Sequence, residues 1–180
     1  MITGYAGQAI KSVLNSEKGF CKFLSANDTG ATGGHQSGIL ISKSAVEMMF
    51  SKQELEQTGI PKRTVKVRWQ DDFETESCFT YYESKNELRI TRFGREFPFL
   101  KPEQTGALFV FTQQTDFDYC GYFLETDEEI EEFLDTFGIS PTETNSLIDT
   151  GKISSETQEK LAIQEFISGL DVDFPASDVM

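Results

Sequence analysis

Apolar and polar residues alternate in short runs over the first two thirds of the chain, with turn residues between the runs. In the clearest run, Thr64–Trp69, Val65 and Val67 alternate with Lys66 and Arg68. A period of two residues is typical of a strand with one buried face. The predicted strands are Cys21–Leu24, Gly38–Ile41, Thr64–Trp69, Cys78–Tyr82, Leu88–Thr91, Ala107–Thr112 and Tyr119–Leu124. Seven short strands with few long helices favour a mainly β barrel or sandwich.

Two helices are predicted in the same part of the chain. Ser44 and Glu47 have the spacing of a capping box, and an apolar stripe of helical period follows it. The stripe consists of Val46, Met49 and Phe50. A second helix is predicted over Gln8–Leu14, ahead of the first strand.

The last third of the chain changes to a helical period. Thr126 and Glu129 predict a helix start, Gly138 predicts its end, and the apolar residues between them lie at i, i+3, i+4 and i+7. These residues are Ile130, Phe133, Leu134 and Phe137. A second acidic helix is predicted from Ser155, with its stripe at Ile163, Phe166, Ile167 and Leu170. We interpret the acidic side chains of both helices as a solvated face.

The length of 180 residues suits one domain, which we place over residues 1–180. The three cysteines are far apart and show neither metal-ligand spacing nor a disulfide framework, which favours a reducing cytoplasm. We find no secretory signal and no apolar run of the roughly 18 residues that would span a membrane. The last residues, DVDFPASDVM, lack a closing element, which is typical of a chain that continues into a longer protein and equally of a disordered natural terminus.

The net charge of −14 argues against a nucleic-acid partner until its distribution is considered. Residues 1–110 hold fourteen Lys and Arg against thirteen Asp and Glu, whereas residues 111–180 hold two against seventeen. The acidity therefore belongs to the last third of the chain. Because the local field matters more than the net charge, a basic surface is compatible with the rest.

Two segments carry candidate chemistry. The first, Ser25–Gly38, is rich in glycine and in small donors and acceptors that suit base edges and phosphates. It fails as a dinucleotide-binding turn, because the glycine spacing is wrong and a strand follows it instead of a helix. The second segment, Glu83–Arg95, places four basic residues within eleven positions. Arginine suits both guanine and phosphate.

Two alternatives come from other classes. One is a small magnesium-dependent nuclease that uses Asp72, Glu83 and Lys85, since Glu83–Lys85 matches a common E-x-K element. We expect Ser84–Asn86 on the polar tip between two strands, where a metal site lacks a rigid pocket. With a single histidine in the chain, a nucleophilic triad is not indicated. The other alternative is an acidic protein-interaction module built on the C-terminal helices.

At these segments the sequence resembles the N-terminal effector domain of EcoRII-type Type II restriction endonucleases. The resemblance rests on FLSANDTGATGGHQSG, then YY followed by LRITRFGR, then PEQTGAL, over about residues 20–112. It implies a seven-stranded open pseudobarrel like that of plant B-three transcription factors. We place the pseudobarrel core at 20–125 and, from the change to a helical period and to acidic charge, an acidic helical extension at 126–180. The resemblance also implies two recognition arms in the major groove, at Ser25–Gln36 and Lys85–Arg95.

The resemblance assigns the DNA contacts to residues of these two arms. The N-terminal arm contributes Ser25, Asn27, Asp28, Thr29, Ala31, Thr32, Gly33, His35 and Gln36. In the C-terminal arm the family's contact pattern falls on Lys85, Asn86, Glu87 and Arg89, and we add Thr91, Arg92 and Arg95 from the same arm. The implied target is double-stranded DNA containing 5′-CCWGG or a close relative. The implied partner is a C-terminal nuclease domain. We expect no catalytic residues, no metal and no cofactor in this domain, with magnesium needed only by the nuclease domain, and we expect no membrane partner.

Overall fold

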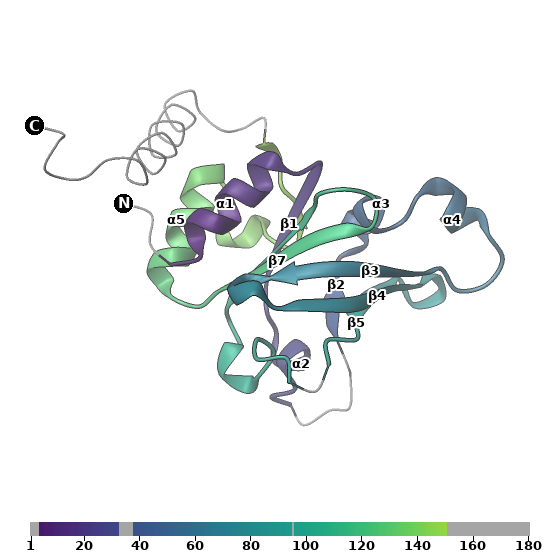
Figure 1. Cartoon of the computed structure of the whole chain (residues 1–180), viewed down its shortest axis with the longest axis horizontal. Helices are drawn as coiled ribbons and strands as arrows, with labels where there is room; N and C mark the ends of the chain where they lie inside the picture. The colour runs from purple at the N-terminus through teal and green to yellow at the C-terminus, as the bar shows by residue number, and fades with distance from the viewer. Residues whose placement is uncertain (1–3, 33–37, 95, 151–180) are drawn as a thin grey trace, which may run out of the picture.

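The protein is described by a computed structural model, which places residues 4–32, 38–94 and 96–150. Within them one curled sheet has the strand order β2-β5-β4-β3-β7-β6-β1-β8 (Figure 1). The strands are β1 (Lys18–Phe23), β2 (Ile39–Ile41), β3 (Lys62–Trp69), β4 (Glu74–Tyr82), β5 (Glu87–Thr91), β6 (Leu108–Gln113), β7 (Asp118–Leu124) and β8 (Ser146–Leu147). Each of the seven predicted strands is confirmed, and the mainly β, open half-barrel architecture agrees with the expected class.

The sheet consists of two antiparallel halves joined by one parallel pair. Strands β2, β5, β4 and β3 form the first half, and β7, β6, β1 and β8 form the second. The parallel pair is β3 with β7, in a register that sets Trp69 opposite Gly121. The first half is continuous in sequence, whereas the second is assembled from segments before and after it.

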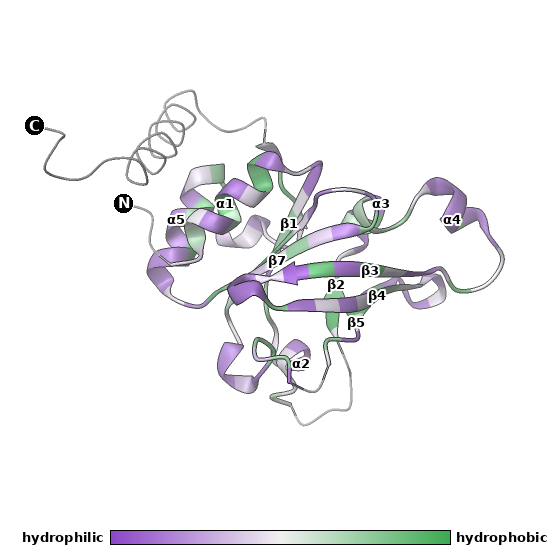
Figure 2. Cartoon of the chain, in the orientation of Figure 1, coloured by the Kyte–Doolittle hydropathy of each residue, from purple (hydrophilic) through white to green (hydrophobic). Residues whose placement is uncertain are grey.

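The concave side of the sheet is filled by aromatic rings around Trp69. The indole lies within 4.9–6.3 Å, centroid to centroid, of five phenylalanine rings. These are Phe93, Phe97, Phe109, Phe111 and Phe123. The alternation of β3 follows from this core, since Val65, Val67 and Trp69 are buried while the residues between them face solvent. Figure 2 shows the alternation as bands of purple and green along β3.

Two helices cover part of the opposite face. Helix α1 (Ala6–Asn15) and helix α5 (Asp127–Phe137) pack together on β1 and β6 (Figure 1). Strand β6 therefore has apolar contacts on both sides, which explains why its sequence LFVFTQ does not alternate. The helix predicted over Gln8–Leu14 and the helix predicted after Thr126 are both confirmed, and Gly138 ends α5 in the left-handed conformation.

The helix predicted from Ser44 begins two residues earlier than expected. The hydroxyl of Ser42 caps a short 3-10 turn, η1 (Lys43–Ala45), by accepting from the Ser44 amide, and α3 (Val46–Met49) follows. A further short helix, α4 (Lys52–Glu56), was not predicted. Arg63 holds it to β3 through Glu54, and this ion pair lowers the pKa of the Glu54 carboxyl.

The helical extension predicted from residue 126 is joined to the rest of the domain in its described part. Strand β8 adds an eighth strand beside β1, because the Asn145 and Ile148 amides donate to the carbonyls of Cys21 and Gly19. Helix α5 is tied to the N-terminal segment, where the Tyr5 amide donates to Glu129 at 2.9 Å. The second acidic helix lies outside the described residues. Of the helices within them, none is long and apolar enough to cross a membrane.

The parallel pair gives a stability prediction. A Cβ on Gly121 would collide with the Trp69 ring, so Gly121→Ala overpacks the centre of the aromatic core. We expect it to lower the free energy of unfolding by about 1–3 kcal/mol in urea titrations. The neighbouring Cys120→Ala, whose side chain points to the other face, should cost less. Equal losses would show that the Trp69 contact does not limit this position.

Candidate functional site

The N-terminal arm, Ser25–Gln36, is described up to Thr32. It begins with α2 (Ala26–Thr29), which is a single turn. The Ser25 hydroxyl accepts from the Asp28 amide at 3.2 Å, and the Asp28 carboxylate accepts from the Ser25 amide at 2.9 Å. This reciprocal cap and the left-handed Gly30 after it fix the shape of the arm's first turn.

A buried ion pair holds the arm to the sheet. Lys22 Nζ lies 2.8 Å from Asp28 Oδ2, and the two side chains are 9% and 1% exposed. The same two groups bind both backbone groups of Leu40: Lys22 donates to its carbonyl at 2.6 Å and its amide donates to Asp28 at 3.1 Å. The beginning of the arm at Ser25 and the strand that follows it are thus bound to one charge pair.

A second support comes from the segment PEQTGAL. The 3-10 turn η4 (Pro102–Gln104) lies beside α2, and Thr105 exchanges a 2.6 Å hydrogen bond with the buried hydroxyl of Thr29. The backbone of Leu24, just before the arm, bonds to Ala107 and Gly106. This segment therefore fixes the first residues of the N-terminal arm and the strand that leads into it.

The C-terminal arm begins at the hairpin between β4 and β5. The turn η3 (Glu83–Lys85) is followed by Asn86 in the left-handed conformation, at φ 55°. Asparagine tolerates that conformation better than most residues. Lys85 and Asn86 are exposed at the tip, so the sequence prediction of a polar turn at this position is confirmed.

Strand β5 carries two opposed faces. Leu88 and Ile90 are fully buried, whereas Glu87, Arg89 and Thr91 lie half-buried on the other face. The guanidinium of Arg89 contacts Glu87 at 3.1 Å through Nη2 and at 3.3 Å through Nε. The Arg89 side chain is only 14% exposed and begins on a paired strand, so its position and its direction are both restricted.

Strands β2 and β5 join the two arms. Leu40, whose backbone is held by the Lys22–Asp28 pair, is the cross-strand partner of Arg89. Gly38, at φ 99°, lies against Ile90 and Thr91 so closely that an added Cβ would collide with the Ile90 carbonyl. Only glycine satisfies both conditions. The structure thus pairs the strand that follows the N-terminal arm with the strand that forms the middle of the C-terminal arm.

The predicted contact residues fall into four groups. Ser25, Asn27, Ala31, Thr32, Lys85, Asn86 and Arg92 are exposed, and Glu87, Arg89 and Thr91 are half-buried. Asp28 and Thr29, both predicted as contacts, are only 5% and 4% exposed, and both have internal partners. Gly33, His35, Gln36 and Arg95 lie outside the described residues.

Sequence reasoning missed two supporting residues, Lys22 and Thr105. A signal for Lys22 was available: a lysine between Phe20, Cys21 and Phe23 in a buried strand requires a partner of opposite charge. Thr105 carries no such signal, because a threonine in a loop is common and its partner lies 76 residues away.

The residues of the nuclease alternative are not brought together. Asp72 follows β3, whereas Glu83 and Lys85 follow β4, so the nine residues of β4 separate them by roughly 30 Å. In the described part of the chain, no three His, Cys, Asp or Glu residues are grouped to hold a metal ion. Burial raises the pKa of the Cys21 thiol to about 12, so this cysteine stays protonated and is a poor nucleophile at neutral pH.

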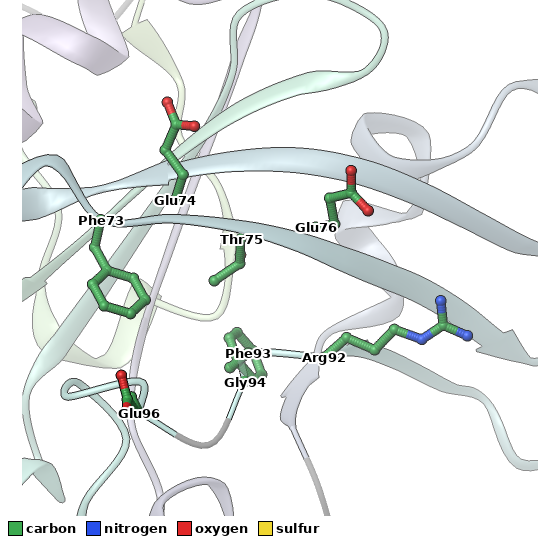
Figure 3. A pocket seen from close by; sticks show the side chains of 8 residues that line it. All are labelled: Phe73, Glu74, Thr75, Glu76, Arg92, Phe93, Gly94 and Glu96. Carbon is green, nitrogen blue, oxygen red and sulfur yellow. The ribbon is translucent and has the colours of Figure 1, made fainter.

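An open pocket of about 640 Å³ lies beside the start of β4 (Figure 3). Its lining combines two phenylalanines and three glutamates with Arg92, the one predicted contact residue in it. The lining residues are Phe73, Glu74, Thr75, Glu76, Arg92, Phe93, Gly94 and Glu96. Arg92 extends away from Phe73, Phe93 and Glu96 in this view.

Comparisons with known proteins agree with this arrangement. The family model described as restriction endonuclease EcoRII, N-terminal, matches residues 14–148. The Type II restriction enzyme EcoRII of Escherichia coli is 39% identical over 97 residues, which cover 49% of this chain and 24% of that enzyme. Among solved structures, the B3 domain of the UbaLAI restriction endonuclease with cognate DNA matches with a TM-score of 0.50 and 19% identity. That match covers 80% of this chain and 94% of the other, and it shows a common fold.

The buried ion pair yields the second prediction. Lys22→Met leaves the Asp28 carboxylate buried without its countercharge, so we expect a loss of about 3–5 kcal/mol in the free energy of unfolding. Lys18 on the same strand pairs with Glu47 at 3.3 Å, with side chains 39% and 60% exposed. Lys18→Met should cost less than about 1 kcal/mol. Similar losses for the two variants in urea titrations would contradict the role given to Lys22.

Proposed function

Because the chain belongs to the family of the EcoRII N-terminal domain, we propose that it is a sequence-specific double-stranded DNA-binding domain. In this role it is the effector, or target-recognition, part of a Type II restriction endonuclease. The match to EcoRII spans about a quarter of that enzyme, and the catalytic function is assigned to a separate nuclease domain C-terminal to this one.

The observation that carries the proposal is the shared base of the two arms. Leu40 and Arg89 are cross-strand neighbours, so one arm cannot shift along the sheet without the other. Two arms held at a fixed separation suit a double helix, because its groove has a fixed width. The exposed polar groups of both arms then face a single ligand.

The chemistry of the arms suits base edges and phosphates. Arg89 offers a bidentate donor fork for guanine, and Glu87 offers an acceptor for the amino group of cytosine. In the free protein these two side chains satisfy each other, and on DNA each takes a base partner. A G·C-rich target such as 5′-CCWGG or a close relative agrees with this pair.

The acidic α5 is assigned no DNA contact. It packs on α1 against the face of the sheet opposite the aromatic core, and its exposed carboxylates would repel phosphates. In Figure 1, α1 and α5 lie at the upper left, whereas α2 of the N-terminal arm lies at the bottom. This domain needs no cofactor in the proposal, magnesium is needed only by the nuclease domain, and the place of action is the bacterial cytoplasm.

The third prediction tests recognition itself. At physiological salt, a CCWGG duplex should bind roughly a thousandfold or more tighter than a scrambled duplex, as for specific DNA-binding domains. The measurement is a fluorescence anisotropy titration with both duplexes. Glu128→Gln with Glu131→Gln, on the exposed face of α5, should leave the ratio of the two affinities unchanged. Equal affinity of the unaltered protein for both duplexes would refute the proposal.

The fourth prediction concerns Arg89. Arg89→Ala should cost about 1–3 kcal/mol on the cognate duplex and much less on the scrambled one, because a base contact carries the sequence information. Lys85→Ala provides the comparison, since an exposed lysine at the hairpin tip should lose affinity for both duplexes alike. If Arg89→Ala weakens both duplexes by the same factor, Arg89 contacts the DNA backbone.

The fifth prediction separates binding from cleavage. Excess protein with plasmid DNA and magnesium should leave the plasmid intact, because Asp72 lies far from Glu83 and Lys85. Agarose electrophoresis provides the measurement. Cleavage that Glu83→Ala abolishes would instead favour the nuclease alternative.

A further inference from the structure

Arg92 follows β5 at a position where the strand's alternation of buried and exposed side chains would bury it. Leu88 and Ile90, four and two residues before it, point into the core and have no exposed surface. A strand that continued in register would place the side chain at position 92 on the same face. Burying a guanidinium among phenylalanines without a partner would be costly.

The chain avoids this cost by a backbone change at Arg92 itself. Its φ is 67°, in the left-handed region that arginine seldom occupies, and its side chain is exposed. No carboxylate among the described residues forms an ion pair with the guanidinium. Figure 3 shows the side chain extending in the direction in which β4 runs, toward the tip of the C-terminal arm. A left-handed backbone conformation at a residue other than glycine is strained, and it persists only where neighbouring groups enforce it.

A chain of three hydrogen bonds reaches from the core to the backbone of Arg92. Trp69 Nε1 donates to Thr75 Oγ1 at 2.9 Å, and Ser77 Oγ donates to the Arg92 carbonyl at 3.1 Å. Thr75 Oγ1 and Ser77 Oγ are 2.8 Å apart. Because the single proton of Ser77 is used on Arg92, Thr75 must be the donor between them. Every donor in the chain then has one acceptor.

The inner groups of this chain are rigid. Ser77 is fully buried, and Trp69 is 4% exposed among its five phenylalanine contacts. The carbonyl of Arg92 is therefore fixed relative to the aromatic core, although the side chain of Arg92 is in solvent. The backbone origin of the Arg92 side chain is thus fixed, and its planar fork loses less freedom per hydrogen bond to an anion than an ammonium group does.

We propose that Arg92 binds a phosphate of the DNA backbone and that Ser77 and Thr75 are the positioning residues that orient it. The inference rests on the proposed DNA-binding function and adds a division of labour within the C-terminal arm. Arg89, inside the strand, contacts a base, whereas Arg92, turned out of the strand, contacts the backbone.

The binding test uses the salt dependence of affinity. Each phosphate contact contributes about 0.9 to the slope of log affinity against log salt concentration. Arg92→Ala should lower that slope by about 1 and weaken cognate and scrambled duplexes by the same factor. Ser77→Ala should lower the slope in the same direction. It should cause no further loss when combined with Arg92→Ala, because it acts through that side chain.

Matched variants separate positioning from general damage. Thr75→Val removes the hydroxyl from a half-buried site with little change in shape and should reduce the slope, whereas Thr75→Ser should retain the original slope. Thr112→Val removes another buried hydroxyl, which contacts Ser12 and Gln114 far from the arm, and should leave the slope unchanged. If Ser77→Ala fails to fold by circular dichroism, the Thr75 pair and Arg92→Ala decide the question.

The hydrogen-bond chain has an assay without DNA. The protein has a single tryptophan, so its indole N–H gives one assigned cross-peak in a ¹⁵N–¹H spectrum. That peak should move in Thr75→Val and Ser77→Ala and remain in place in Thr112→Val.

The outcomes distinguish the two proposals. If the unaltered protein binds neither duplex, the proposed function fails, and the phosphate contact fails with it, whatever the indole peak shows. If the protein binds DNA but Arg92→Ala leaves the slope unchanged, the phosphate contact is overturned and the proposed function stands. An unchanged slope in Thr75→Val, with a moved indole peak, would overturn the positioning role alone.

Discussion

The buried ion pair between Lys22 and Asp28 is the contact on which the candidate interface depends. It is placed where a glycine-rich loop leaves one half of the sheet and enters the other, and it binds both backbone groups of Leu40. An apolar pair could fill the same space but could not bind an amide and a carbonyl together. The energetic cost of burying two charges is thus offset by hydrogen bonds that define the position of a loop.

The two arms are supported by different means. Charge and hydroxyl groups hold the N-terminal arm, through Lys22, Asp28 and the Thr29–Thr105 contact. The C-terminal arm is a continuation of the sheet, and the aromatic rings around Trp69 hold it from the concave side. Both supports meet at the pairing of β2 with β5, where the absence of a side chain at Gly38 permits the close approach of the two backbones. Flexible polar groups can then face a ligand from a rigid base.

The strands and the two long helices could be predicted because their patterns are local. Val65 and Val67 alternate with charged residues, and Phe133 and Phe137 lie one turn apart. The parallel pairing and the partner of Asp28 could not be predicted, since they join segments distant in sequence or depend on loop conformation. Asp28 is an example: its type suited a ligand contact, but only the fold shows that its oxygens are already bound. Similarly, the alternation of β5 predicted its buried face and gave no indication that Arg92 leaves it.

The single parallel pair between β3 and β7 bears on how the chain reaches this fold. In the first half, short connections join β3 to β4 and β4 to β5, whereas the second half must join β1 to β6 across the whole of the first. Loop-closure entropy therefore favours early formation of the continuous half and delays the joining of the two halves. The N-terminal arm connects the two halves, so it would take its final shape only in the last step of folding.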